Sequence, residues 1–171
     1  MFRELKNAAG TLKALKRLCD AAVKEAEREG LAEVGSEHFL LAAFALPDGT
    51  AERSFQPFGV DAAGLRAAIE QSQAEALALA GFVSGAMPRP EPITRRANAL
   101  ALPASASGRA VLERLSEAGP ASEVLCGAHV ILAVVSARRG VVPRVLAHLG
   151  ISPDALGAAA SVERDTLLTR A

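Results

Sequence analysis

The stretch VGSEHFLLAAFALPDGTAERSFQPFG, residues 34–59, recurs in altered form as LCGAHVILAVVSARRGVVPRVLAHLG at residues 125–150. The two copies align without a gap, and a histidine, an apolar run, an arginine and two glycines keep their places. The matched pairs are His38 and His129, Leu41 and Leu132, Ala42 and Ala133, Gly49 and Gly140, Arg53 and Arg144, and Gly59 and Gly150. Because a repeat of this size usually cannot bury its apolar face alone, we expect two helical half-units that pack against each other.

Alanine dominates the composition, at 37 of 171 residues, while tryptophan and tyrosine are absent. Alanine is the best helix former and is depleted in strands. No stretch of useful length alternates apolar and polar residues as a half-buried strand would. We therefore predict an all-α fold of two pseudo-symmetric four-helix repeats, about eight helices, in one domain over residues 1–171. The first repeat is expected over about 11–80, a linker over 81–103 and the second repeat over about 104–168.

Local signals place the individual helices. Ser36 is the expected N-cap of a helix over 38–46 that is apolar on all sides, and Asp61 is the expected N-cap of a helix that reaches about residue 80. Ser152 followed by Pro153 is a typical helix start. The other expected helices cover 11–29, 50–58, 104–118, 127–138 and 141–148, with a further short piece over 94–101.

The charge is balanced overall and uneven locally. Lysine and arginine total 19, as do aspartate and glutamate, so net charge gives no bias towards nucleic acid or membrane. Residues 1–17 nevertheless carry a net +4, and residues 20–37 a net −4. This asymmetry fits a solvated helix with a complementary neighbour, and it also fits a polar docking surface. The start has no apolar signal segment and no run is long enough to span a membrane, so we expect a cytoplasmic protein.

The residue pattern favours no enzyme class. No glycine is followed by lysine, which excludes a phosphate-binding loop of the Walker type. The histidines His38, His129 and His148 form no H-x-x-x-H pair, so we expect no metal and no cofactor. Cys19 and Cys126 lie in apolar patterns and are expected to be small buried residues. A nucleophilic Cys19 activated by a histidine is a disfavoured alternative that the sequence leaves open.

The motif Gly-Ser-Glu-His followed by an apolar run at 35–41, with Gly-Val-Asp at 59–61, resembles the repeat of the Clp N-terminal domain. That domain stands at the front of the ClpA and ClpC unfoldases. The resemblance covers about residues 11–80 and 104–160. In the second half Gly127 and Ala128 stand where the family pattern has a hydroxyl residue and a glutamate.

The resemblance implies a non-catalytic protein-recognition module, expected to be a monomer. Its partners would be an adaptor protein, a degradation substrate or a component of the Clp machinery. The implied binding residues are Ser36 and Glu37 at one helix start and Gly127 at the equivalent start. In the family the glutamate of this motif lines a pocket for phosphorylated arginine. Here Glu37 would meet the guanidinium, while the second half would keep the helix-start amides at Gly127 without an acid.

Two other functions remain open at this point. One is a sequestering or decoy protein, which would bind small molecules or phosphoarginine-bearing peptides that otherwise target the Clp unfoldase. The other is a small enzyme, disfavoured because the residue pattern contains no legible nucleophile or acid–base pair.

Overall fold

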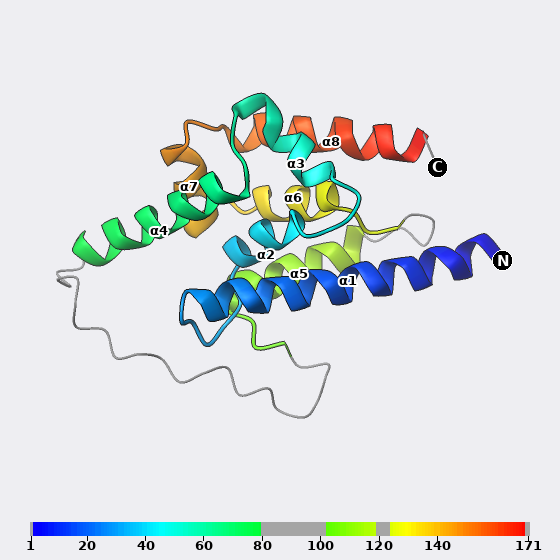
Figure 1. Cartoon of the computed structure of the whole chain (residues 1–171), viewed down its shortest axis with the longest axis horizontal. Helices are drawn as coiled ribbons and strands as arrows, with labels where there is room; N and C mark the ends of the chain where they lie inside the picture. Colours follow the sequence, from blue (N-terminus) through cyan, green and yellow to red (C-terminus); the bar gives the residue numbers. More distant parts are fainter. Residues whose placement is uncertain (1, 80–101, 119–123, 170–171) are drawn as a thin grey trace.

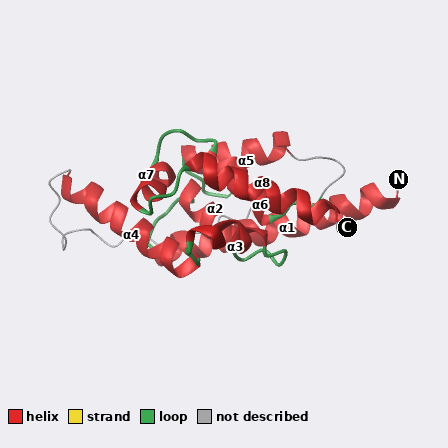
Figure 2. Ribbon diagram, turned by 90° about the horizontal axis from the view of Figure 1, so that it is seen from above, coloured by secondary structure: helices red, strands yellow, loops and turns green. Residues whose placement is uncertain are grey.

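A computed structural model describes residues 2–79, 102–118 and 124–169, in which helices are joined by short loops and no strand longer than an isolated bridge forms (Figures 1 and 2). It holds eight α-helices and one short 3-10 helix, which confirms the all-α prediction. The helices are α1 (Phe2–Arg28), α2 (Ser36–Ala43), α3 (Thr50–Phe55) with the 3-10 turn Gln56–Phe58, α4 (Ala62–Leu79), α5 (Ala106–Ala118), α6 (Gly127–Val135), α7 (Val141–His148) and α8 (Pro153–Thr169).

Two predicted starts follow the local signals. Helix α7 has the expected limits of 141–148, and the Asp61 carboxylate caps α4 by accepting the Gly64 N–H at 2.7 Å. Ser36, in contrast, is the first residue of α2 and not its N-cap, which is Gly35. Helix α1 begins at Phe2, nine residues before the expected residue 11. The expected short piece over 94–101 lies outside the described residues, as does most of the linker.

Helix α2 ends at residue 43, three residues earlier than predicted. The next three amides, from Phe44 to Leu46, bond to carbonyls three residues back, at 3.0–3.2 Å. This tightened turn ends the α-helical pattern before Pro47. Helix α6 stops in the same way, because the Ala137 amide bonds to the Val134 carbonyl. The apolar pattern therefore overestimated the length of both central helices.

The core is built around α2 and α6, which lie between α1 below and α8 above in Figure 1. Every residue of α2 is buried, and Phe39 and Leu40 are fully inaccessible. Helix α2 packs on α1 and α6, and α6 packs in turn on α8 and α5. An all-round apolar helix must be surrounded by protein to be stable in water. The two recurring apolar runs of the sequence therefore form the interior.

Several helix pairs join the chain before the linker to the chain after it, and three of them are the most extensive. Helix α2 packs on α6, α3 on α8, and α4 on α7. Each half thus covers apolar side chains of the other. Whether the two halves are related by a pseudo-symmetric operation stays a prediction.

A short backbone seam also joins the halves. Val34 and Ala104 form an isolated parallel β-bridge. The Val34 N–H donates to the Pro103 carbonyl at 2.7 Å, and the Ser105 N–H donates to the Val34 carbonyl at 3.1 Å. Ser105 also caps α5, because its hydroxyl oxygen accepts the Gly108 N–H. The seam holds the start of α5 against the segment that leads into α2.

Within the described residues, no single helix is long and apolar enough to cross a membrane. Helices α7 and α8 reach the necessary length and hydropathy only as a pair, and that pair is bent by 95°.

Candidate functional site

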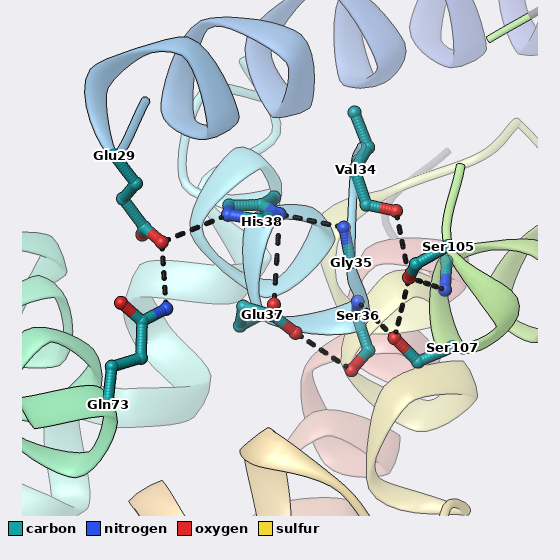
Figure 3. A network of polar contacts seen from close by, with 10 residues as sticks. Glu29, Val34, Gly35, Ser36, Glu37, His38, Gln73, Ser105 and Ser107 are labelled. Atoms are coloured by element: carbon teal, nitrogen blue, oxygen red, sulfur yellow. Dashed lines mark hydrogen bonds and ion pairs between the residues drawn. The ribbon is translucent and has the colours of Figure 1, made fainter. Parts of the chain in front are cut away.

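The start of α2 is organised by a buried histidine (Figure 3). The Nδ1 atom of His38 accepts the N–H of Gly35, the N-cap residue, at 2.7 Å. A nitrogen that accepts this bond carries no proton, so the neutral ring carries its proton on Nε2. That nitrogen faces Glu29 Oε2 at 3.2 Å. Both ring nitrogens are therefore engaged in holding the helix start to the end of α1.

Glu29 links three helices through one carboxylate. Its Oε2 atom accepts from His38 on α2 and from Gln73 on α4, the latter at 2.8 Å. Burial alone would raise the pKa of the Glu29 carboxyl. The hydrogen bonds from His38 and Gln73, together with the positive charge of Arg66, outweigh burial and hold this pKa below its ordinary value. Its Oε1 atom is buried and has no partner among the described residues.

The lowered pKa of Glu29 predicts a loss of stability in acid. A carboxyl group whose pKa is lower in the folded state stabilises the fold above its unfolded pKa, about 4.3 for glutamate. That contribution disappears as the pH falls through the lower folded pKa. We expect Glu29→Gln to remove this part of the acid dependence, measured as unfolding free energy in urea between neutral pH and pH about 3. Glu52→Gln, on the exposed side of α3, is the control, and an identical acid dependence in both variants would contradict the assignment.

Glu37, at the start of α2, is a second acidic side chain with little exposure, and its surroundings differ from those of Glu29. The residue is only 7% exposed, and its Oε2 atom accepts the Ser36 hydroxyl at 3.2 Å. Its Oε1 atom lies 3.9 Å from His38 Nδ1, which carries no proton. The carboxylate folds back over Gly35, where an added Cβ would lie 2.3 Å from Oε1. Among the described residues, no lysine or arginine forms an ion pair with Glu37.

Hydroxyl groups from the start of α5 complete this region. The Ser36 N–H donates to Ser107 Oγ at 3.2 Å, and Ser107 Oγ lies 3.0 Å from Ser105 Oγ. Ser107 is exposed, whereas Ser36 is buried. Neither Ser105 nor Ser107 could be predicted from the sequence as part of this region, because they lie about 70 residues away and belong to no motif. We call Ser36, Glu37, Ser105 and Ser107 the α2-start site.

The structure places Gly127 in different surroundings. The Asp48 carboxylate accepts the Gly127 N–H at 3.2 Å, and the Thr50 hydroxyl oxygen accepts the Ala128 N–H at 2.8 Å. The Thr50 hydroxyl in turn donates to Asp48. The amides expected to be free at the start of α6 are thus occupied by Asp48 and by Thr50, the first residue of α3.

Gly127 also has a packing role. A Cβ at this position would lie 2.9 Å from both the Cβ and the backbone nitrogen of Ala51. Only glycine lets α3 approach α6 so closely. The contacts of Gly127 are therefore with residues 48–51. Ser36 instead bonds to Ser107 of α5, and Glu37 bonds to Ser36, so the three predicted residues do not form one site.

The structure brings Cys126, and not Cys19, against a histidine. Cys126 Sγ lies 3.0 Å from His129 Nδ1, which also faces the Cys126 N–H at 3.3 Å. Burial raises the pKa of the Cys126 thiol, which favours its protonated form. Burial likewise raises the pKa of Cys19. The C-x-x-H spacing of 126–129 is the sequence signal of this pair, and in the structure it forms the cap of α6.

The described residues contain no group of three or more histidine, cysteine, aspartate or glutamate side chains that could hold a metal ion. No family model matches the chain, and no curated protein matches it. The resemblance to the Clp N-terminal domain therefore stays a prediction that rests on the motif residues.

Proposed function

We propose that this chain is a non-catalytic protein-recognition module of the Clp N-terminal-domain type. Its partner would be an adaptor, a degradation substrate or a component of the Clp machinery, and the α2-start site would receive a basic group of that partner. The observation that carries the proposal is Glu37, a buried carboxylate without a cationic partner in the described part of the chain.

The energetics of Glu37 support a cationic ligand. Burying a charge is costly unless the charge is paired and hydrogen-bonded. Here one serine hydroxyl is the described donor to the carboxylate, at 3.2 Å. An incoming guanidinium would supply two parallel charge-assisted hydrogen bonds, which are about twice as strong as neutral ones. Arginine therefore fits the site better than lysine, whose ammonium is a point charge.

The hydroxyl groups beside Glu37 support a phosphorylated form of that ligand. Ser107 is exposed, and its hydroxyl is the present acceptor for the Ser36 amide. If the Ser107 side chain turns away, the Ser36 amide and the serine hydroxyls become donors for a phosphoryl group next to the guanidinium. A phosphoarginine side chain presents these two groups in that order. The start of α6 offers no equivalent, since Asp48 already occupies it.

The histidines and cysteines support a role without catalysis. Both ring nitrogens of His38 are engaged, by Gly35 and by Glu29. A general base needs a free nitrogen within reach of the proton that it abstracts. Burial favours the protonated form of both thiols. We therefore propose binding, and not turnover, as the activity of the α2-start site.

The test is a binding titration with Glu37→Gln, which keeps the size of the side chain and removes its charge. We expect the parent protein to bind free phosphoarginine or a short peptide with one arginine. Losing a charge-assisted hydrogen bond costs about 1.5–3 kcal/mol, so the variant should bind roughly tenfold to 150-fold more weakly. Glu33→Gln, an exposed residue on the loop before α2, is the matched control. Equal affinity of parent and Glu37→Gln for these ligands would refute the proposal.

A further inference from the structure

The imidazole ring of His38 lies between two carboxylates, one facing each ring nitrogen (Figure 3). Glu29 Oε2 is 3.2 Å from Nε2, and Glu37 Oε1 is 3.9 Å from Nδ1. The His38 side chain is 1% exposed, and those of Glu29 and Glu37 are 10% and 9% exposed. The neutral ring carries its one proton on Nε2, so it donates to Glu29 and has no proton to offer Glu37.

The cation nearest to this cluster serves α1 and not Glu37. Arg66 of α4 bonds to Glu25 at 2.9 and 3.0 Å, and its charge also lowers the pKa of Glu29. Helices α5, α6 and α7 pack on α2 as well, but in the described part of the chain none of their charged groups forms an ion pair with His38 or Glu37. A second proton on the His38 ring is therefore the positive charge that the fold itself can place beside Glu37.

A second proton would change the hydrogen-bond partner of Nδ1. In the neutral ring Nδ1 accepts the Gly35 N–H at 2.7 Å, and this bond belongs to the cap of α2. A protonated Nδ1 cannot accept that bond, and its own N–H needs an acceptor. Glu37 Oε1 would have to move by about 1 Å to reach the distance of a charge-assisted hydrogen bond, about 2.8 Å. The carboxylate would then face the ring of His38.

We propose that His38 regulates the α2-start site in response to pH, because its protonated ring competes with a cationic ligand for the Glu37 carboxylate. This inference rests on the proposed function, which assigns such a ligand to Glu37. The neutral ring caps α2 and leaves Glu37 open, whereas the protonated ring releases Gly35 and pairs with Glu37. A guanidinium that binds Glu37 thus displaces the second proton of the ring into solvent, and ligand binding and proton binding oppose each other. Histidine is the side chain that ordinarily changes charge near neutral pH.

The first test needs no ligand and follows the Gly35 amide and the His38 ring nitrogens by NMR as the pH is lowered from about 8 to about 5. In the parent protein we expect the ring to gain its second proton and the Gly35 amide proton to move upfield as its bond to Nδ1 is lost. In Glu37→Gln both changes should occur at lower pH, because the protonated ring has lost its charged partner. A parent ring that stays neutral over this range overturns the inference, as does an identical titration of parent and Glu37→Gln.

The second test measures binding of an end-blocked peptide with one arginine and no other charge, by calorimetry at pH about 7.5 and about 5.5. We expect the parent to bind about fivefold or more weakly at the lower pH, and His38→Gln to change by less than about twofold. Glutamine at this position of a capping box can accept the Gly35 N–H but does not titrate. Protonation of Glu37 itself would weaken both proteins, so the comparison isolates His38.

The outcomes separate the two proposals. Equal pH dependence in the parent and His38→Gln overturns the regulation by His38 and leaves the proposed function intact. No binding of the peptide by the parent at either pH refutes the proposed function, and with it the competition at Glu37. In that case the NMR titration still shows whether the ring and Glu37 are coupled.

Discussion

Replacing Gly108 with alanine is expected to lower the free energy of unfolding by about 3 kcal/mol or more. A Cβ at this position would lie 2.1 Å from the Val34 carbonyl oxygen. The obstacle is backbone and not the end of a mobile side chain, so relief requires the start of α5 to move away from Val34. That movement would break the hydrogen bonds of the seam, in which the Val34 carbonyl accepts from the Ser105 amide.

Gly157→Ala is the matched control, since it is the same substitution within another helix of the second half. The nearest atom to its added Cβ would be Val135 Cγ2, at an ordinary contact distance of 3.5 Å. Alanine in a helix interior is favoured over glycine by about 0.5–1 kcal/mol, so this variant should be slightly stabilised. Urea unfolding followed by circular dichroism compares the two. A Gly108→Ala variant as stable as the parent would show that the seam is not closely packed.

The helices could be predicted from the sequence because their signals are local. Asp61 precedes α4 by one residue and caps it directly, and Pro153 opens α8. One exception is the start of α1, which lies at Phe2 and not at the expected residue 11. In the structure Gly10 lies inside the helix, and its added Cβ would be 3.1 Å from Val124. In the sequence, a glycine that is needed because a distant side chain packs against it looks the same as a glycine that ends a helix.

The candidate site was less predictable, because its partners are far apart in the chain. Ser36 and Glu37 belong to a motif and could be named. The residues that surround the two helix starts could not, since Ser107 is 71 positions from Ser36 and Asp48 is 79 positions from Gly127. Composition and periodicity do not predict contacts between residues so far apart in the sequence. The sequence therefore suggested equivalent helix starts at α2 and α6. In the structure the carboxylate of Asp48 occupies the start of α6.

Separating the halves is expected to abolish folding altogether. We expect neither residues 1–85 nor residues 86–171 to unfold cooperatively when expressed alone. Each half alone would expose the apolar side chains that the other half covers, because α2 packs on α6, α3 on α8 and α4 on α7. Phe39 and Ile131, both fully buried in the intact chain, lie on the two central helices. Half-units of this size bury only about 60% of their surface even when compact, so their stability is marginal.

Mixing the two fragments provides the decisive comparison. If the interior is shared, equimolar fragments should regain the helical circular dichroism of the intact chain and unfold in one concentration-dependent transition. In that case the covalent connection between the halves is not needed for their association, because the packing of α2 on α6 is enough to bring them together in the correct arrangement. A single fragment that melts cooperatively near the intact midpoint would instead mean that one half carries its own core. The cross-half helix pairs would in that case be a contact between two folded units, and Asp48 at the start of α6 would be an interdomain cap.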